Sequence, residues 1–150
     1  MTPVLLAGAL LWGSLSQLAD DRSVVVLAVS SDTGFILPLE SASRDGSVWR
    51  GEFVEIFALG EEPYDTARRE SVLEINCDTA QFRALFVRSI DRTEAVKSSD
   101  ETPTEWEPLE LSFPPFFYLH AVACENLKVD EFAVGFSDAV ADIRTSIQRY

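Results

Sequence analysis

Positively charged side chains are scarce in this sequence of 150 residues. Lys and Arg number 12 against 25 Asp and Glu, which gives a net charge of −13 and a pI near 4.3. Because nucleic-acid binding draws most of its affinity from cationic contacts with phosphates, we expect no nucleic-acid partner. A negatively charged membrane leaflet repels such a surface as well. The acidity favours solubility, and attraction to a basic partner is the alternative interpretation.

Metal ligands and phosphate-binding motifs are scarce too. The chain has one histidine, His120, and two cysteines without a CxxC pair, which is too few for a four-ligand structural zinc site. It has no Gly-rich phosphate loop and no dinucleotide fingerprint. An acidic group lacks the regular alternation of an EF-hand loop, so we expect a solvated loop and no cofactor or metal. This group is Asp100, Glu101, Glu105, Glu107 and Glu110.

The first 19 residues carry no charged side chain, and residues 4–15 are almost wholly apolar. This run is shorter than the roughly 20 residues that span a bilayer. It has the length of a signal-peptide core, and Ser14-Leu15-Ser16 supplies a small-x-small cleavage pattern, so we expect export with a mature start near Gln17 or Asp20. No Lys or Arg precedes the run. The alternatives are a buried first strand or helix, or an uncleaved anchor, and only a retained segment would give membrane contact.

Cys77 and Cys124 are the only cysteines. Exported proteins keep disulfides that cytosolic proteins lose, and two cysteines suffice for one bond. Both residues end predicted strands on apolar faces, so antiparallel neighbours would bring them within bonding distance. We predict a disulfide between them. The alternative is a pair of buried, reduced thiols in an intracellular protein.

Alternating apolar residues and turn signals predict a β-rich chain. The turn signals are Ser30-Ser31-Asp32-Thr33-Gly34 and Arg44-Asp45-Gly46-Ser47, with Gly34 supplying permissive backbone in the first. In the longest strand, Trp49, Phe53, Phe57 and Leu59 share one face, whereas Val54 and Ile56 make the opposite face apolar toward the end of the strand. Predicted strands cover residues 24–29, 35–39, 48–59, 71–77, 82–90 and 116–124, with loops at 60–69 and 91–110.

A helical pattern closes the chain. Phe132, Phe136, Val140, Ile143 and Ile147 recur at helical spacing, and Asp130 is a candidate N-cap. We therefore predict an α+β fold: a mainly antiparallel sheet of about five to six strands, with a C-terminal helix over residues 130–148 packed on it. Residues 1–19 form the signal peptide or apolar segment, and residues 20–150 form a single domain.

Two motifs raise the question of catalysis. Asp32-Thr33-Gly34 resembles the catalytic turn of aspartic proteases, but those enzymes need a second carboxylate and the chain has no second such triplet. A hairpin turn is the better interpretation. His120 lies on an aromatic stretch without a Gly-x-Ser-x-Gly elbow, so we interpret it as structural. We expect no enzyme.

An aromatic group precedes and enters the last predicted strand. It consists of Trp106, Phe113, Phe116, Phe117 and Tyr118. If the sheet is covered on both faces, these side chains belong to the core. If one face is open, they form an exposed patch of the kind that marks a protein interface.

The order of several segments resembles the surface-adhesin protein E-like domain family of Gram-negative bacterial envelopes. The similar segments are Ser41-Ala42-Ser43-Arg44-Asp45-Gly46 before the strand with Trp49, then Glu74-Ile75-Asn76-Cys77 with Arg83, then Trp106 and a Pro-containing turn before Cys124. The resemblance covers about residues 24–125. It implies an exported domain with an antiparallel sheet and a disulfide joining the two cysteines. The chain departs from the family in its C-terminal helix, and it lacks a lipobox cysteine.

These observations predict a noncatalytic protein-binding module, adhesin-like by resemblance, in the periplasm or at the cell surface. The alternative is an accessory structural subunit that stabilises a larger envelope or membrane assembly. Either function implies a protein partner.

Overall fold

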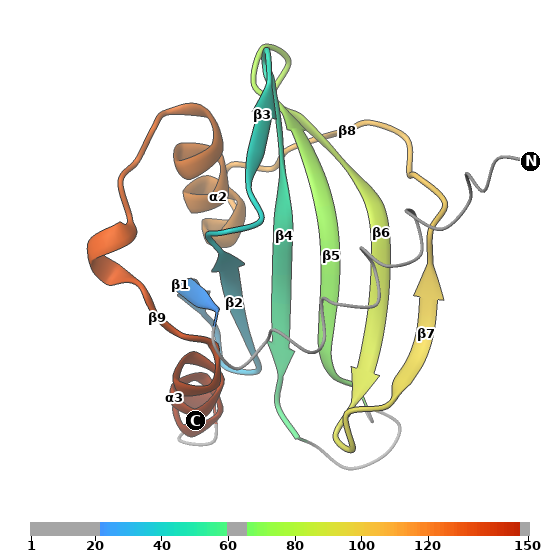
Figure 1. Ribbon diagram of the computed structural model, residues 1–150, viewed down its shortest axis with the longest axis vertical. Helices are drawn as coiled ribbons and strands as arrows, with labels where there is room; N and C mark the ends of the chain where they lie inside the picture. The colour runs from blue at the N-terminus through green and yellow to red at the C-terminus, as the bar shows by residue number, and fades with distance from the viewer. Residues whose placement is uncertain (1–21, 60–65, 148–150) are drawn as a thin grey trace, which may run out of the picture.

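The computed structural model describes residues 22–59 and 66–147. Within them, nine strands form one antiparallel sheet in which the path β7-β6-β5-β4-β2-β1-β9 is continuous, while β3 pairs with β4 and β8 with β6 (Figure 1). The strands are β1 (Ser23–Val29), β2 (Thr33–Pro38), β3 (Ser43–Asp45), β4 (Val48–Phe57), β5 (Thr66–Asn76), β6 (Gln81–Asp91), β7 (Val96–Asp100), β8 (Glu107–Pro108) and β9 (Val134–Gly135). The helical elements are α2 (Pro114–Cys124), the 3₁₀ turn η1 (Asp130–Phe132) and α3 (Phe136–Ile147).

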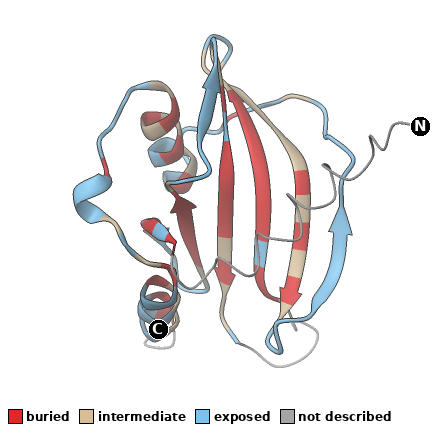
Figure 2. Cartoon of the chain, in the orientation of Figure 1, coloured by how far each residue is buried: buried red, intermediate tan, exposed pale blue. Residues whose placement is uncertain are grey.

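The two α-helices cover opposite faces of the sheet, because adjacent residues of a strand point to opposite sides and here join different cores. In β4, Phe53 belongs to the core under α2, whereas Val54 belongs to the core under α3. In β2, Leu37 and Ile36 divide in the same way. The predicted two-sided burial of the long strand is therefore confirmed. Figure 2 shows the buried strands in the middle of the sheet and the exposed β7 at its edge.

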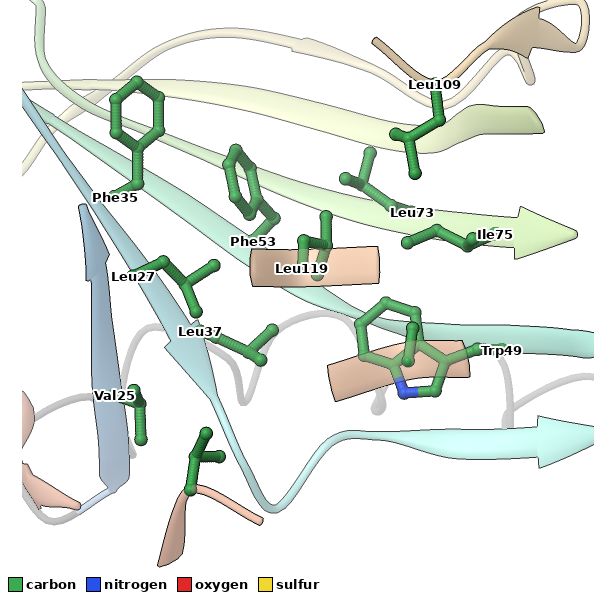
Figure 3. Close-up of a cluster of buried hydrophobic side chains, with 12 residues drawn as sticks. Val25, Leu27, Phe35, Leu37, Trp49, Phe53, Leu73, Ile75, Leu109 and Leu119 are labelled. Carbon is green, nitrogen blue, oxygen red and sulfur yellow. The ribbon is translucent and has the colours of Figure 1, made fainter. Parts of the chain in front are cut away.

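The core under α2 is the larger of the two clusters, and ten of its residues are labelled in Figure 3. Leu119 and Ala123 enter it from α2, and the strands contribute Trp49, Phe53 and Leu73 among others. The core under α3 joins Phe136, Ala139, Ile143 and Ile147 to strand residues such as Ile56. The C-terminal helix packed on the sheet and the predominance of antiparallel strands are thus confirmed.

The predicted strand over residues 116–124 is wrong: these residues lie in α2. A short apolar run has no periodicity that separates a strand from a buried helix. Pro114 and Pro115 occupy the first turn, where proline's fixed φ suits a helix and its missing N–H costs nothing. The pair of prolines was the available signal for a helix start.

The predicted number of strands is also wrong, because nine form instead of five to six. Strands β7 and β8 lie inside the predicted loop 91–110, and β5 begins at Thr66, within the predicted loop 60–69. Residues 60–65 of that loop, and residues 1–19, lie outside the described residues. The short strands have polar or mixed sequences and form by pairing with longer neighbours, so their own residues carry no alternation.

The last helix begins later than predicted. Asp130 opens η1 rather than α3, and Val134 pairs with Val24 of β1 before the chain turns into the helix. Phe132 is 64% exposed and does not belong to the helical core face, unlike Phe136. Residue 148 lies outside the described residues. At the end of β4, Phe57 is only half-buried and Leu59 is exposed, so the predicted core face stops at Phe53.

The two predicted turns form, but their glycines differ in role. Gly46 has φ +60°, a left-handed conformation that the β3–β4 turn requires. Gly34 lies in β2 rather than in the preceding turn, and a Cβ built there would meet Ile143 Cγ2 at 2.3 Å. The absence of a side chain at Gly34 therefore lets α3 approach the sheet.

We expect Gly34→Ala to lower the free energy of unfolding by about 1–3 kcal/mol, because the added methyl overpacks the contact with Ile143. Chemical denaturation measures this loss. Gly135→Ala is the matched control, since the nearest atom to its Cβ would be 3.7 Å away. In a double-mutant cycle, Ile143→Ala, which removes all three atoms that the new Cβ would meet, should recover part of the loss caused by Gly34→Ala. Strictly additive effects would contradict the proposed contact.

Candidate functional site

The C-terminal end of α2 is fastened to the sheet by a disulfide. Cys77 follows β5 directly and bonds to Cys124, the last residue of α2, with the two Cα atoms 5.5 Å apart. The predicted disulfide is confirmed, although Cys124 ends a helix and not a strand. A guanidinium N–H of Arg44 donates a hydrogen bond to the carbonyl of Ala123. A cation at the negative end of a helix satisfies a terminal carbonyl and stabilises that end.

We expect Cys77→Ser/Cys124→Ser to lower the free energy of unfolding by about 2–4 kcal/mol, because the bond closes a chain segment with a sequence separation of 47 residues. Urea denaturation under oxidising conditions measures the change. Reductant should destabilise the native chain by a similar amount and leave the double variant unaffected. A double variant as stable as the oxidised native chain would show that the bond adds nothing.

Three aromatic side chains lie on the outward side of α2 and its start. Phe117 is 52% exposed, Tyr118 is 43% exposed and Phe113 is 38% exposed. The rings of Phe117 and Tyr118 pack edge to face with centroids 5.4 Å apart. Figure 2 shows exposed segments on α2 next to buried ones. We call Phe113, Phe117 and Tyr118 the α2 ridge.

Part of the predicted aromatic surface packs on the protein itself. Although Phe113 is partly exposed, its ring lies edge to face with those of Phe35 and Phe116, with centroids 5.6 and 5.2 Å away. Phe116 is half-buried, and its ring lies 5.2 Å from that of Phe82 and 6.1 Å from that of Phe53. Trp106 is half-buried beneath Arg83, whose guanidinium carbon is 4.7 Å from the ring centre. The five residues of the predicted aromatic surface therefore divide between core and surface. Side chains of a helix such as α2 point in all directions around its axis, whereas those of a strand point to only two faces.

Carboxylates lie at both ends of the α2 ridge. At the start, the main chain of the exposed Glu110 lies next to the ridge, because its backbone carbonyl accepts a hydrogen bond from the Phe113 N–H at 3.1 Å. At the other end, an oxygen of the exposed Glu125 carboxylate is 3.6 Å from His120 Nδ1. The helix carries no basic residue in its last turn and no acidic residue in its first. The border of the ridge is thus acidic.

The residues weighed for catalysis lie in separate elements. Asp32 stays within the β1–β2 turn, where its carboxylate accepts hydrogen bonds from the hydroxyls of Ser30 and Thr33. His120 belongs to α2 and lies beside Glu125. No group of three or more His, Cys, Asp or Glu side chains within residues 22–59 and 66–147 is arranged to hold a metal ion. Asp32 and His120 therefore have local partners of their own.

The face of the sheet that carries α3 contains buried ion pairs that the sequence pattern did not predict. Glu70 accepts hydrogen bonds from Arg68 Nε at 2.9 Å and from Arg88 Nε at 2.8 Å, and all three residues are buried. Buried Arg22 and Glu52 form a second pair. The guanidinium carbons of Arg22 and Arg68 lie 5.7 and 6.0 Å from the centre of the Phe136 ring. These charges surround the start of α3.

Arg68 remains charged despite its burial. Desolvation alone would lower the pKa of its guanidinium, but hydrogen bonds and attraction from Glu94 and Glu70 outweigh this effect and raise the pKa. The Arg68 to Glu94 contact is 2.5 Å, and the Glu94 side chain is largely exposed. Charged residues of opposite sign facing each other on neighbouring strands were the signal in the sequence. Without the register of the strands, that signal could not be assigned.

We expect Glu70→Ala to cost about 3–5 kcal/mol in the free energy of unfolding, because it removes a carboxylate shared by two buried arginines. Glu94→Ala removes a solvent-exposed partner of Arg68 and should cost about 1 kcal/mol or less. Urea denaturation of both variants at one pH gives the comparison. Equal losses would show that burial does not govern the strength of these pairs.

Comparison with known proteins identifies no family. No family model matches the chain, and neither a curated protein nor a solved structure matches it. Within the described residues, no helix has both the length and the apolar character needed to cross a membrane.

Proposed function

We propose that the chain is a noncatalytic protein-binding module of the bacterial envelope and that the α2 ridge is its contact surface. The observation that carries the proposal is the exposure of Phe117 and Tyr118 on α2 and of Phe113 directly before it. Aromatic side chains contribute strongly to binding energy at protein interfaces, and a cluster of them on a surface marks a site of interaction. The adhesin-like resemblance agrees with this proposal.

Two further observations support the kind of partner and the compartment. The ridge is bordered by Glu110 and Glu125 on a chain of net charge −13, which favours a partner surface with apolar and basic side chains. A disulfide persists in oxidising compartments, which supports the periplasm or the cell surface as the location.

We expect Phe117→Ala/Tyr118→Ala to weaken partner binding by at least about tenfold, because interface aromatics often contribute 2 kcal/mol or more. The full chain, immobilised, is incubated with the native envelope fraction, and recovered proteins are quantified by mass spectrometry. Phe132→Ala is the matched control, since Phe132 is 64% exposed but lies in η1 rather than on α2. Binding should also weaken at high salt.

The same recovery distinguishes the alternative function. A partner lost with the ridge variant and kept with Phe132→Ala supports the binding module. Equal recovery by both variants removes the α2 ridge as the contact surface. If the chain instead purifies from native membranes in a fixed-stoichiometry complex that the ridge variant leaves intact, the accessory structural subunit becomes the better proposal.

A further inference from the structure

A hollow of about 500 Å³ lies between the β2–β3 connection, the second half of α2 and the segment that follows α2. This volume falls within the range of small-molecule binding sites. Its apolar lining includes Leu39, Trp49 and Val122, of which Leu39 and Val122 are half-buried and Trp49 is buried. The exposed side chains of the α2 ridge do not line it. The hollow is therefore a separate feature from the proposed protein-binding surface.

Trp49 brings a hydrogen-bond donor to this hollow. Its six-membered ring lies over Gly51, where a Cβ would come within 2.4 Å of the ring carbon Cη2, so the missing side chain of Gly51 makes room for the indole. Trp49 is only 5% exposed, and no described residue accepts a hydrogen bond from its indole nitrogen. Among the described residues, the enclosed side-chain nitrogens without a partner are Nε of Arg22, Arg83 and Arg144, so the indole nitrogen of Trp49 keeps contact with solvent. Figure 3 shows that nitrogen on the side of the β2–β3 connection, which forms a wall of the hollow.

The indole N–H of tryptophan usually donates to an acceptor, and a donor that is open to solvent takes that acceptor either from water or from a ligand. An acceptor supplied by a ligand would satisfy the Trp49 donor. Such an acceptor is a carbonyl or carboxylate oxygen, since the indole nitrogen can only donate.

Charges of both signs line the same hollow. Lys128 and Asp130 are exposed and flank Val129, which is buried in the core under α2 and holds the segment in place. In the part of the chain that the structure describes, no ion pair joins Lys128 to Asp130. A separated ammonium and carboxylate beside an apolar floor suit a ligand that itself carries both charges and an apolar group.

We propose that this hollow binds a zwitterionic apolar amino acid, or a dipeptide of the same character. The apolar side chain lies against the half-buried Leu39 and Val122, the ligand carboxylate accepts from Trp49 Nε1 and pairs with Lys128, and the ligand ammonium pairs with Asp130. A ligand of zero net charge also avoids the repulsion that a chain of net charge −13 exerts on anions.

The test follows the indole N–H resonance of Trp49 by NMR in the ¹⁵N-labelled full chain, assigned through its loss in Trp49→Phe. The ligands are leucine, phenylalanine and leucyl-leucine, with leucinamide lacking the carboxylate and N-acetyl-leucine lacking the ammonium. We expect leucine or phenylalanine to shift the resonance. Removal of either charge should weaken binding by at least about tenfold, because a hydrogen bond to a charged group is stronger than one between neutral groups.

The variants assign each charge to its partner. The Lys128→Met variant lacks the partner of the ligand carboxylate, so it should bind leucine as weakly as it binds leucinamide. The Asp130→Asn variant lacks the partner of the ligand ammonium, so it should bind leucine as weakly as it binds N-acetyl-leucine. Lys97→Met, on the edge strand β7, is the matched control and should bind as the native chain does. If only leucyl-leucine shifts the resonance, the ligand is a dipeptide. Two results would overturn the proposal: no shift of the resonance at millimolar ligand, or equal shifts with leucine, leucinamide and N-acetyl-leucine.

Discussion

Burial on both faces of the central strands is the constraint on which the rest of the structure depends. Along β2 and β4, successive side chains enter different cores, as Ile36 and Leu37 do. Strands that are apolar on both sides need cover on both sides, whereas a single helix covers only one. The chain meets this requirement with α2 on one face and α3 on the other.

The two covering helices are held by different means. At α3, Phe136 packs among the buried ion pairs of Arg22 and Arg68, and Ile143 fits into the space left by Gly34. At α2, the helix is apolar around most of its circumference, and it is fastened at its end by Cys124 and Arg44. Helices that are apolar all round are usually buried on every side. The outward side of α2 is not, and that mismatch creates the α2 ridge.

The sequence predicted the features that depend on local pattern. Alternation identified the cores of β4 and β5, turn residues identified the turn at Gly46, and helical spacing identified most of the buried face of α3. The disulfide was predicted from the number of cysteines and from the expected export of the chain. The strands, the turn and the helix are each encoded by a local pattern of residues. The disulfide was predictable because the chain has only two cysteines.

The errors came from features that depend on pairing between distant segments. The run around Leu119 has no periodicity that decides between strand and helix, so only packing on the sheet reveals α2. Strands β7 and β8 form because their backbones pair with β6. Their own sequences have no alternation of apolar and polar residues that would predict a strand. The hollow beneath Trp49 joins three segments far apart in the sequence, and its chemistry became visible only when Lys128 and Asp130 were placed beside it.

The two proposed sites share one helix, and this links their energetics. Tyr118 of the ridge and Val122 of the hollow are four residues apart, hence one turn apart on α2. A ligand between Val122 and the β2–β3 connection touches both the helix and the sheet, so it binds only while α2 is docked. Such a ligand stabilises the docked state in proportion to the logarithm of its concentration. Because coupling of binding free energies is reciprocal, a partner that selects docked α2 at the ridge raises affinity at the hollow as well.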